Sequence, residues 1–417
     1  AASRNTVSAT DEAVVTKAIE GAMAERPEMD PELYGFLKDI LLLRVAGSQE
    51  GELAMRFQQL TSPAMAKGLE DTAFYRYFRL VALNEVGGDP GQFGTSVVQF
   101  HRACTERQVR HPLAMLASST HDTKRSEDVR ARLALLSEIP QRWRDAVRSW
   151  SVHNERHRHG EIPDRNTEYL LYQTLVGAWP IDETRMTAYM EKAVREAKAY
   201  TNWTQQNEEY ESGLRGFIEA VMADEAFRTK LAGFVDDLVY PGRVNSLAQT
   251  LIKLTAPGVP DIYQGCELWD LSLVDPDNRR PVDFAIRKRL LNELEGLSSE
   301  EILARMDEGV PKLWVVRQTL DVRGRRPELF GPKSEYRALT VSGAKANHVV
   351  AYLRGERIAT VAPRLVLGLK GNWEDTAIEL PEGRWSNVLT GDELKGGAVH
   401  LKALLARFPI GLLERKE

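Results

Sequence analysis

Apolar positions recur every three to four residues over the first part of the chain. Tyr34, Leu37 and Ile40 fall on one side of a helix with about 3.6 residues per turn. Thr10 stands where an N-cap would begin the first helix. The spacing predicts helices over residues 10 to 60.

A different pattern follows, in which turns frame one short apolar run. Gly and Pro are frequent between residues 61 and 95, as expected for tight turns. Leu113 to Ala117 is a continuous apolar run, and polar residues 118 to 122 come directly after it. This order predicts a short buried strand whose C-terminal end carries the polar residues.

Residues 126 to 238 lack any convincing strand pattern, and the sequence predicts that almost all of this stretch is helical. Asn245 is a plausible cap for a further helix, which Pro257 and Gly258 would end. Val259 to Tyr263 is a second short apolar run and predicts another buried strand.

Beyond residue 310 the apolar period changes to two, which predicts strands separated by Gly and Pro turns. The candidate strands are Trp314 to Val316, His348 to Tyr352, Ile358 to Val361 and Ala377 to Leu380. We expect a C-terminal all-β domain of the β-sandwich type in this region.

Together these elements predict an α/β chain followed by an all-β domain. Short buried strands that end in polar residues suit a (β/α)8 barrel of the TIM type, whose active site lies at the C-terminal strand ends. The few strands suggest only the C-terminal part of such a barrel. The predicted segments are a helical segment (1–60), a barrel segment (61–125), a large helical insertion (126–244), the last barrel helix and strand (245–309) and the C-terminal β-domain (310–417).

Composition narrows the classes of partner. The formal net charge of the 417 residues is −5, so the protein has no positive electrostatic field that would attract nucleic acid or an anionic membrane. A neutral substrate fits this charge. Cys104 and Cys266 are too few for a disulfide framework and suggest a reducing cytoplasm. The sequence shows neither a bilayer-spanning apolar run nor a signal peptide. It opens at Ala1 without a methionine, and we expect a truncated protein.

The segment from Ser118 to Arg125 contains the side chains best suited to catalysis or substrate binding. It places the His121 imidazole, the Asp122 carboxylate and two cations at the mouth of the predicted strand. A carboxylate and an imidazole can hold vicinal hydroxyls, and a nearby anion stabilises an oxocarbenium-like transition state. The same residues can form a loop in which Asp122 or Ser126 caps a helix. Spacing alone does not separate these two interpretations.

An apolar strand that ends in His121-Asp122 resembles the fourth signature region of the α-amylase superfamily, glycoside hydrolase family 13. The longer string from Thr120 to Arg130 is narrower and resembles the maltooligosyl trehalose synthases. Other segments resemble the same family, namely residues 65–77, 84–90, 165–175, 203–211 and 257–282. The likeness runs from near residue 10 to the end of the chain.

The resemblance implies an isomerase that uses neither cofactor nor metal. In the family reaction, an intramolecular transglucosylation converts the reducing-end α-1,4 bond of a malto-oligosaccharide to an α,α-1,1 bond. The resemblance makes Asp122 the third catalytic carboxylate, a transition-state stabiliser, and makes His121 a contact to the sugar in the −1 subsite. Lys67, Lys124 and Tyr75 are suited to line a closed, dry +1 site.

Two further groups of residues leave alternatives open. Arg279, on a turn after the eighth-strand signature, either binds sugar hydroxyls or joins Arg280 and Asp277 in a structural ion-pair network. His153 and His157 have the i, i+4 spacing of zinc ligands on a helix. Their charged and polar neighbours favour a solvated helix end instead.

One departure from the family pattern limits the expected activity. The family's nucleophilic Asp and general-acid Glu lie on earlier barrel strands, and a retaining mechanism needs two carboxyl groups about 5 to 5.5 Å apart. Glu70 and Asp71 are the nearest candidates, but the sequence around them resembles a different part of the family's enzyme. The chain alone is therefore expected to be inactive and to need the missing N-terminal half of the barrel. Two alternatives remain: a silent malto-oligosaccharide-binding module, and another α-amylase-type hydrolase or transglycosylase.

Overall fold

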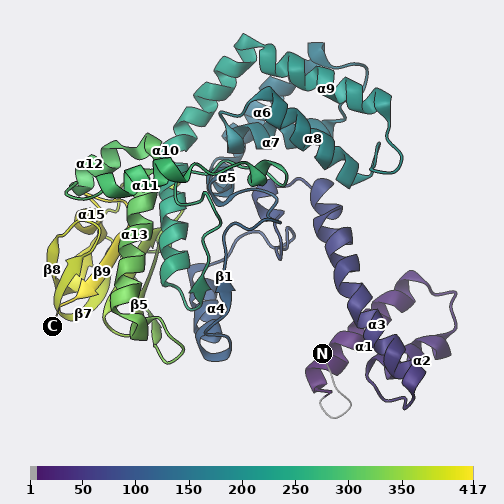
Figure 1. Ribbon diagram of the computed structural model, residues 1–417, viewed down its shortest axis with the longest axis horizontal. Coiled ribbons are helices and arrows are strands. Elements are labelled where there is room, and N and C mark those ends of the chain that lie inside the picture. Colours follow the sequence, from purple (N-terminus) through teal and green to yellow (C-terminus); the bar gives the residue numbers. More distant parts are fainter. Residues whose placement is uncertain (1–6, 417) are drawn as a thin grey trace. The chain divides into compact units, whose positions relative to one another are not determined.

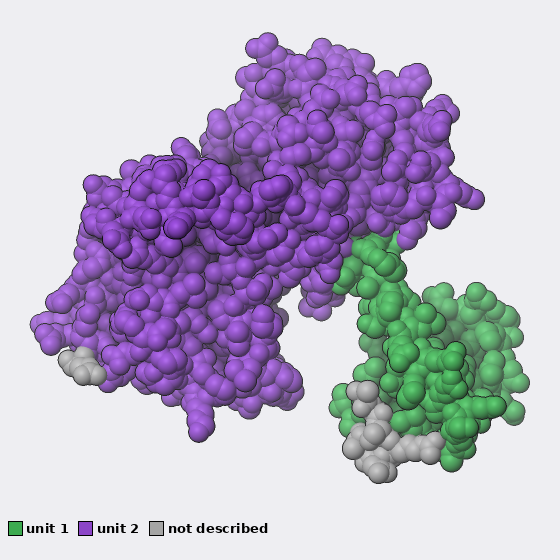
Figure 2. All heavy atoms as spheres, viewed as in Figure 1, with its two compact units in different colours: residues 1–73 green, residues 74–417 purple. Residues whose placement is uncertain are grey.

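The computed structural model describes residues 7 to 416, in two compact units. The first unit comprises residues 1–73 and the second residues 74–417, shown in different colours in Figure 2. The opening Ala1-Ala2-Ser3 lies outside the described residues. Lys67 therefore belongs to the first unit, and the other predicted site residues belong to the second.

The first unit is helical throughout its described residues. It contains α1 (Ala9–Glu25), α2 (Pro31–Leu41) and α3 (Ser48–Met65), followed by a short π-helical turn (Ala66–Glu70) (Figure 1). The predicted cap, Thr10, is wrong by two residues. The Ser8 hydroxyl accepts the Asp11 N–H at 3.1 Å, and Asp11 accepts the Ser8 N–H at 2.8 Å. Ser8 is preferred because an acidic residue stands three positions after it, which completes a reciprocal capping box.

The second unit contains the two strands predicted around the polar loop. α4 (Val97–Arg110) precedes β1 (Met115–Leu116), which pairs in parallel with β2 (Val259–Pro260). Each strand has only two residues, and neither is buried, because Met115 is 66% exposed and Val259 38%. Burial was predicted wrongly because the described chain supplies no further strand to this two-stranded sheet.

Helices fill the stretch between the two strands, as the sequence predicted. They are α5 (Glu127–Leu133), α6 (Pro140–Asn154), α7 (Arg165–Ala178), α8 (Glu183–Ala197), α9 (Glu208–Ala223) and α10 (Glu225–Thr255). Trp143 and Trp150 on α6 pack against Phe234 on α10, with ring centroids 5.8 and 5.3 Å away. Among residues 7 to 416, no helix combines the length and apolarity needed to cross a membrane.

The long helix α10 continues unbroken through Pro241 and Asn245. The prediction that Asn245 caps a new helix is therefore wrong. Its side chain instead donates a hydrogen bond to the carbonyl of Ala131 on α5, at 3.2 Å. This contact ties the middle of α10 to the helix that follows the His121–Asp122 loop.

Three helices follow β2 and lead to the C-terminal sheet. They are α11 (Phe284–Glu293), α12 (Ser299–Ala304) and α13 (Val310–Arg325). Trp314 to Val316, predicted as a strand, lies inside α13. Leu313, Val315 and Val316 are all buried, so this part of the helix lacks the polar face that marks a helical period. The strands accordingly begin at Tyr336 and not near residue 310.

The C-terminal strands form one seven-stranded antiparallel sheet, with the order β3-β5-β6-β9-β7-β4 and with β8 paired to β7. The strands are β3 (Tyr336–Ala338), β4 (Val341–Ser342), β5 (Val349–Arg354), β6 (Ile358–Pro363), β7 (Ala377–Asn387), β8 (Glu393–His400) and β9 (Gly411–Arg415). Two short helices, α14 (Val366–Leu369) and α15 (Leu401–Leu404), lie between strands.

The predicted strands near residues 350, 360 and 378 are present, but the strands do not separate into the two sheets of a sandwich. The reason is β7, which pairs with β4, β8 and β9 and joins them into one sheet.

Candidate active site at the His121–Asp122 loop

The predicted His121-Asp122 pair lies in the loop after β1, on the C-terminal side of that strand. The Asp122 side chain is 80% exposed and that of His121 is 51% exposed. His121 Nδ1 lies 3.1 Å from Asp122 Oδ1. The carboxylate is therefore open to an incoming molecule at a strand end.

Short hydrogen bonds shape this loop. The Asp122 N–H donates to Thr120 Oγ1 at 3.2 Å, and Thr123 Oγ1 donates to the Thr120 carbonyl at 2.8 Å. Asn278, from the segment after β2, donates to the His121 carbonyl at 2.8 Å. The loops that follow the two paired strands therefore touch, as expected when parallel strands end at one edge.

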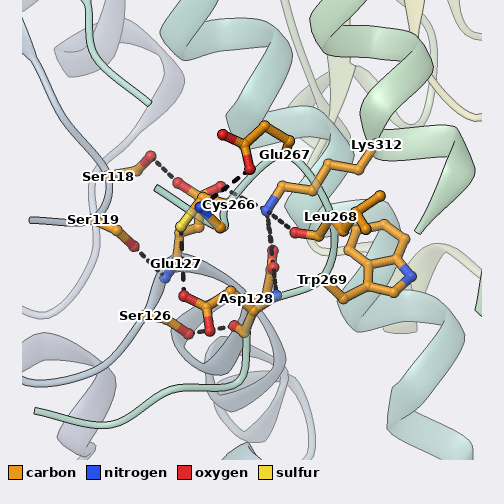
Figure 3. Close-up of polar contacts among 12 residues, drawn as sticks. Ser118, Ser119, Ser126, Glu127, Asp128, Cys266, Glu267, Leu268, Trp269 and Lys312 are labelled. Atoms are coloured by element: carbon orange, nitrogen blue, oxygen red, sulfur yellow. Dashed lines mark hydrogen bonds and ion pairs between the residues drawn. The ribbon is translucent and has the colours of Figure 1, made fainter. Parts of the chain in front are cut away.

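Next to this loop lies a buried charge cluster, which we define as Glu127, Asp128, Lys253 and Lys312. Figure 3 labels Glu127, Asp128 and Lys312 of this cluster. Lys312 Nζ lies 2.7 Å from Glu127 Oε1 and 2.8 Å from Asp128 Oδ2, and Lys253 Nζ lies 3.1 Å from Glu127 Oε2. Glu127 and Asp128 begin α5, Lys253 lies in the last turn of α10, and Lys312 lies in the first turn of α13. The cluster therefore joins three helices.

The electrostatics of this cluster follow from burial and mutual attraction. Burial opposes the charge of Glu127, but Lys312 and Lys253 outweigh burial and lower its pKa to about 2. Burial likewise opposes the charge of Lys312, yet the two carboxylates raise the pKa of its ammonium. Burial raises the pKa of Asp128, and Lys312 offsets only part of that rise.

The cluster also holds the loops that follow β1 and β2. The Glu127 N–H donates to Ser119 Oγ at 2.9 Å, and the Ser118 hydroxyl donates to the Glu127 carboxylate. From the other loop, the Asp270 N–H donates to Asp128 Oδ2 at 2.7 Å. Because the four charged side chains are almost fully buried, they support the loop and are not accessible for contact with a substrate.

Sequence reasoning did not find the buried charge cluster. Its only local signals are the consecutive carboxylates Glu127-Asp128 at a helix start and one lysine, Lys312, inside the apolar run from Val310 to Val316. A lysine within a buried run needs a partner, but the sequence does not say which carboxylate supplies it.

Lys124 and Tyr75, both predicted to line a +1 site, lie together but are buried. The Lys124 ammonium is 5.9 Å from the centroid of the Tyr75 ring, within cation–π range. The two residues are 6% and 4% exposed. Lys67 pairs with Asp71 in the first unit. The role of these three residues beside a sugar stays a prediction.

Arg279 and Arg280 pair with carboxylates of their own segment, at 3.0 Å to Asp275 and 3.0 Å to Asp277 respectively. Asp277 also accepts two hydrogen bonds from Arg185 on α8, each 2.8 Å long. Ion pairs therefore do hold this turn, although Arg279 pairs with Asp275 and not with Asp277. The Arg279 side chain is 52% exposed, and its contact to sugar stays a prediction.

The histidines after α6 converge on one carboxylate. His153 Nε2 and His157 Nε2 each lie 3.0 Å from Asp224 Oδ2, and Arg156 pairs with the same atom. Hydrogen bonds from His157 and Arg156 are the main causes that lower the pKa of Asp224. The two imidazoles are only 17% and 21% exposed, whereas the Arg156 side chain between them is 58% exposed, so this helix end is partly solvated. Within the described chain, no group of three or more His, Cys, Asp or Glu could hold a metal ion.

Comparison with known proteins identifies related sequences. No protein-family model matches the chain. Two Mycobacterium tuberculosis proteins, from strains CDC 1551 and H37Rv and both named as maltooligosyl trehalose synthases, are 38% identical over 402 residues, or 94% of this chain. The match covers 49% of each relative, so the chain spans about half the length of these curated relatives.

Solved structures give the same relationship. The maltooligosyltrehalose synthase of Arthrobacter ramosus matches with a TM-score of 0.86 and 39% identity, over 97% of this chain and 51% of that one. A Sulfolobus tokodaii protein, described as a hypothetical maltooligosyl trehalose synthase, matches with a TM-score of 0.74 and 30% identity, over 99% and 56%. By sequence and by fold, the chain is similar to a part of the maltooligosyl trehalose synthases that spans about half of their length.

Proposed function

We propose that the chain is the C-terminal portion of a maltooligosyl trehalose synthase. In this proposal β1 and β2 belong to a (β/α)8 barrel, and the helices between them include an insertion into that barrel. The parallel pairing of Met115 with Val259 supports this arrangement, because a parallel pair requires a long crossover between its strands. The identity of 38% over 94% of the chain is the observation that carries the proposal.

The complete enzyme would act on the reducing end of a malto-oligosaccharide. The terminal α-1,4 bond breaks as the glycosyl carbon bonds to an enzyme carboxylate, and the freed glucose takes up a proton. The anomeric hydroxyl of that glucose then attacks the glycosyl carbon and gives its proton back to the general acid that supplied the first one. This releases the carboxylate and gives an α,α-1,1 bond, with no net consumption of water. Asp122 would stabilise the positive charge that develops in both steps.

The geometry of the loop supports these roles for Asp122 and His121. The exposed Asp122 carboxylate stands beside the His121 imidazole, which can donate to a sugar hydroxyl. The nucleophile and the general acid would come from the other half of the barrel, so this chain alone would turn nothing over. Buried, unpaired Cys104 and Cys266 fit a reducing cytoplasm, where we propose that the enzyme acts.

Product analysis tests this function. The protein that carries this chain together with the upstream half of the barrel is incubated with a malto-oligosaccharide of defined length. The proposal expects a product of unchanged mass that has lost its reducing end. Release of glucose or maltose as the main product would instead establish a hydrolase.

The alternative of a silent binding module is tested with the two halves supplied separately. Turnover that appears only when the upstream half is added to this chain supports a shared active site. Sugar binding by this chain, with no turnover in any combination that assembles, would establish the binding module.

A further inference from the structure

Glu85 binds the backbone just after Asp122. The Lys124 N–H donates to Glu85 Oε1 at 2.7 Å, and the Arg125 N–H donates to Oε2 at 3.2 Å. Each carboxylate oxygen thus holds one of two successive amides, and the Val86 N–H also donates to Oε1, at 3.0 Å. Hydrogen bonds to an ionised acceptor are about twice as strong as neutral ones. Glu85 therefore fixes the path of the chain two residues beyond Asp122.

The segment that carries Glu85 is itself held firmly. Its neighbour Asn84 is fully buried and donates to the carbonyls of Phe74 and Tyr77, at 2.9 and 2.6 Å. The Arg130 guanidinium, from α5, lies 3.6 Å from Glu85 Oε2. The carboxylate thus has a fixed position of its own and can impose that position on the loop.

Burial prevents Glu85 from acting on the sugar directly. Its side chain is only 10% exposed, and both oxygens already accept backbone hydrogen bonds. A general acid or base must come within hydrogen-bond reach of the reacting atom. Glu85 is therefore not the second carboxylate that the sequence lacks, and any effect it has on the reaction passes through the loop.

We propose that Glu85 is a positioning residue that holds the Asp122 carboxylate in the geometry required at the transition state. The inference rests on the proposed function, because it assigns Asp122 to the sugar. A misplacement of about 1 Å can cost about 100-fold in rate. Release of the loop therefore lowers turnover far more than it weakens substrate binding, since Asp122 matters most in the transition state.

Glu85→Gln in the protein with the complete barrel tests this inference. The amide keeps the shape of the side chain but turns an NH2 group toward one of the two backbone N–H groups. We expect kcat to fall about 10- to 100-fold while KM changes less than about threefold. Glu414→Gln is the matched control, because Glu414 is also 10% exposed and pairs with Arg325 at 3.2 Å in the C-terminal sheet. That control is expected to keep kcat even if its melting temperature falls.

A double variant separates positioning from general stability. When Asp122→Asn is already present, Glu85→Gln should lower kcat by less than about threefold, because the group that it positions is gone. If the losses in kcat of the two single substitutions simply multiply in the double variant, the inference is overturned. It is also overturned if Glu85→Gln keeps the wild-type kcat while Asp122→Asn is inactive. Wild-type turnover for Asp122→Asn alone would instead overturn the proposed role of Asp122, and this inference with it.

A second substitution covers the case in which Glu85→Gln does not fold. Glu85→Asp keeps the charge and both oxygens but withdraws them by one methylene from the Lys124 and Arg125 amides. The same loss in kcat, with little change in KM, is expected for this variant. Wild-type kcat in a folded Glu85→Asp enzyme would contradict the positioning role.

Discussion

Glu127 is fully buried and lies 2.7 Å from Lys312 and 3.1 Å from Lys253. Although burial alone would raise the pKa of this carboxyl, the two cations lower it from an ordinary 4.5 to about 2. A carboxyl whose pKa falls on folding stabilises the folded state above its unfolded pKa, and this contribution is lost as the pH falls through the folded pKa. The stabilisation by Glu127 is therefore complete above about pH 4.5 and disappears toward about pH 2.

Glu127→Gln should lower the free energy of unfolding by about 3 to 5 kcal/mol at pH 7, because it removes one partner from a buried ion pair. The difference from the wild type should shrink as the pH falls from about 4.5 to about 2. Urea unfolding at a series of pH values measures both effects. Glu295→Gln serves as the control, because the Glu295 side chain is 79% exposed. A difference that stays constant over this pH range would contradict the account.

At the scale of elements, α7 packs tightly on α5, the helix that leads away from the His121–Asp122 loop. A Cβ added at Gly177 on α7 would lie 2.8 Å from Val129 Cγ1 and 2.9 Å from Leu133 Cγ. Gly177→Ala should therefore lower the free energy of unfolding by about 1 to 3 kcal/mol through overpacking. Gly216→Ala on α9 is the matched control, since nothing lies within 4 Å of an added Cβ there.

The control substitution should be neutral or stabilise the protein by up to about 1 kcal/mol, because Ala favours a helix over Gly. Thermal or urea unfolding of the two variants measures the contrast. Equal stability of Gly177→Ala and Gly216→Ala would show that α5 and α7 are not in the close contact described.

Local sequence signals predicted the elements that have one polar and one apolar side. Tyr34 and Ile40 are buried on α2, and β7 alternates between buried and exposed residues over its first part. The strands β5 and β6 are buried at every residue, and the sequence located them by their apolar, β-branched runs. α13 was mistaken for a strand because Val315 and Val316 are β-branched and buried along with their neighbours.

The candidate site was predictable only in part. The sequence located His121 and Asp122 after a strand, but it could not reveal the groups that hold them. Glu85 contacts Lys124 across 39 positions of the chain, and Lys312 contacts Asp128 across 184. Such pairings depend on tertiary packing, which local periodicity does not encode.

At the scale of the whole molecule, the two-stranded sheet presents apolar side chains to solvent. Met115 on β1 is 66% exposed and Val259 on β2 is 38% exposed, and Leu113, in the turn before β1, is 62% exposed. Among the described residues, β1 and β2 pair only with each other, so each keeps an open edge. Open, apolar strand edges favour association with other strands.

We therefore expect the 417-residue chain to self-associate when it is expressed without a partner. Met115→Lys should weaken that association by about tenfold or more, because a charge at an open edge opposes strand pairing. Val152→Lys on α6 is the control, since Val152 is 80% exposed and lies outside the strands. Sedimentation velocity over a range of concentrations measures the change. A chain that stays monomeric throughout would contradict this expectation.

The central claim is that Asp122 meets the sugar in the transition state, and steady-state kinetics of Asp122→Asn test it most directly. The measurement uses the protein with the complete barrel, and Asp145→Asn, an exposed substitution on α6, serves as the control. The account predicts that kcat falls by several orders of magnitude while KM changes little, because the lost contact forms mainly in the transition state. Wild-type kcat in a folded Asp122→Asn enzyme would contradict it.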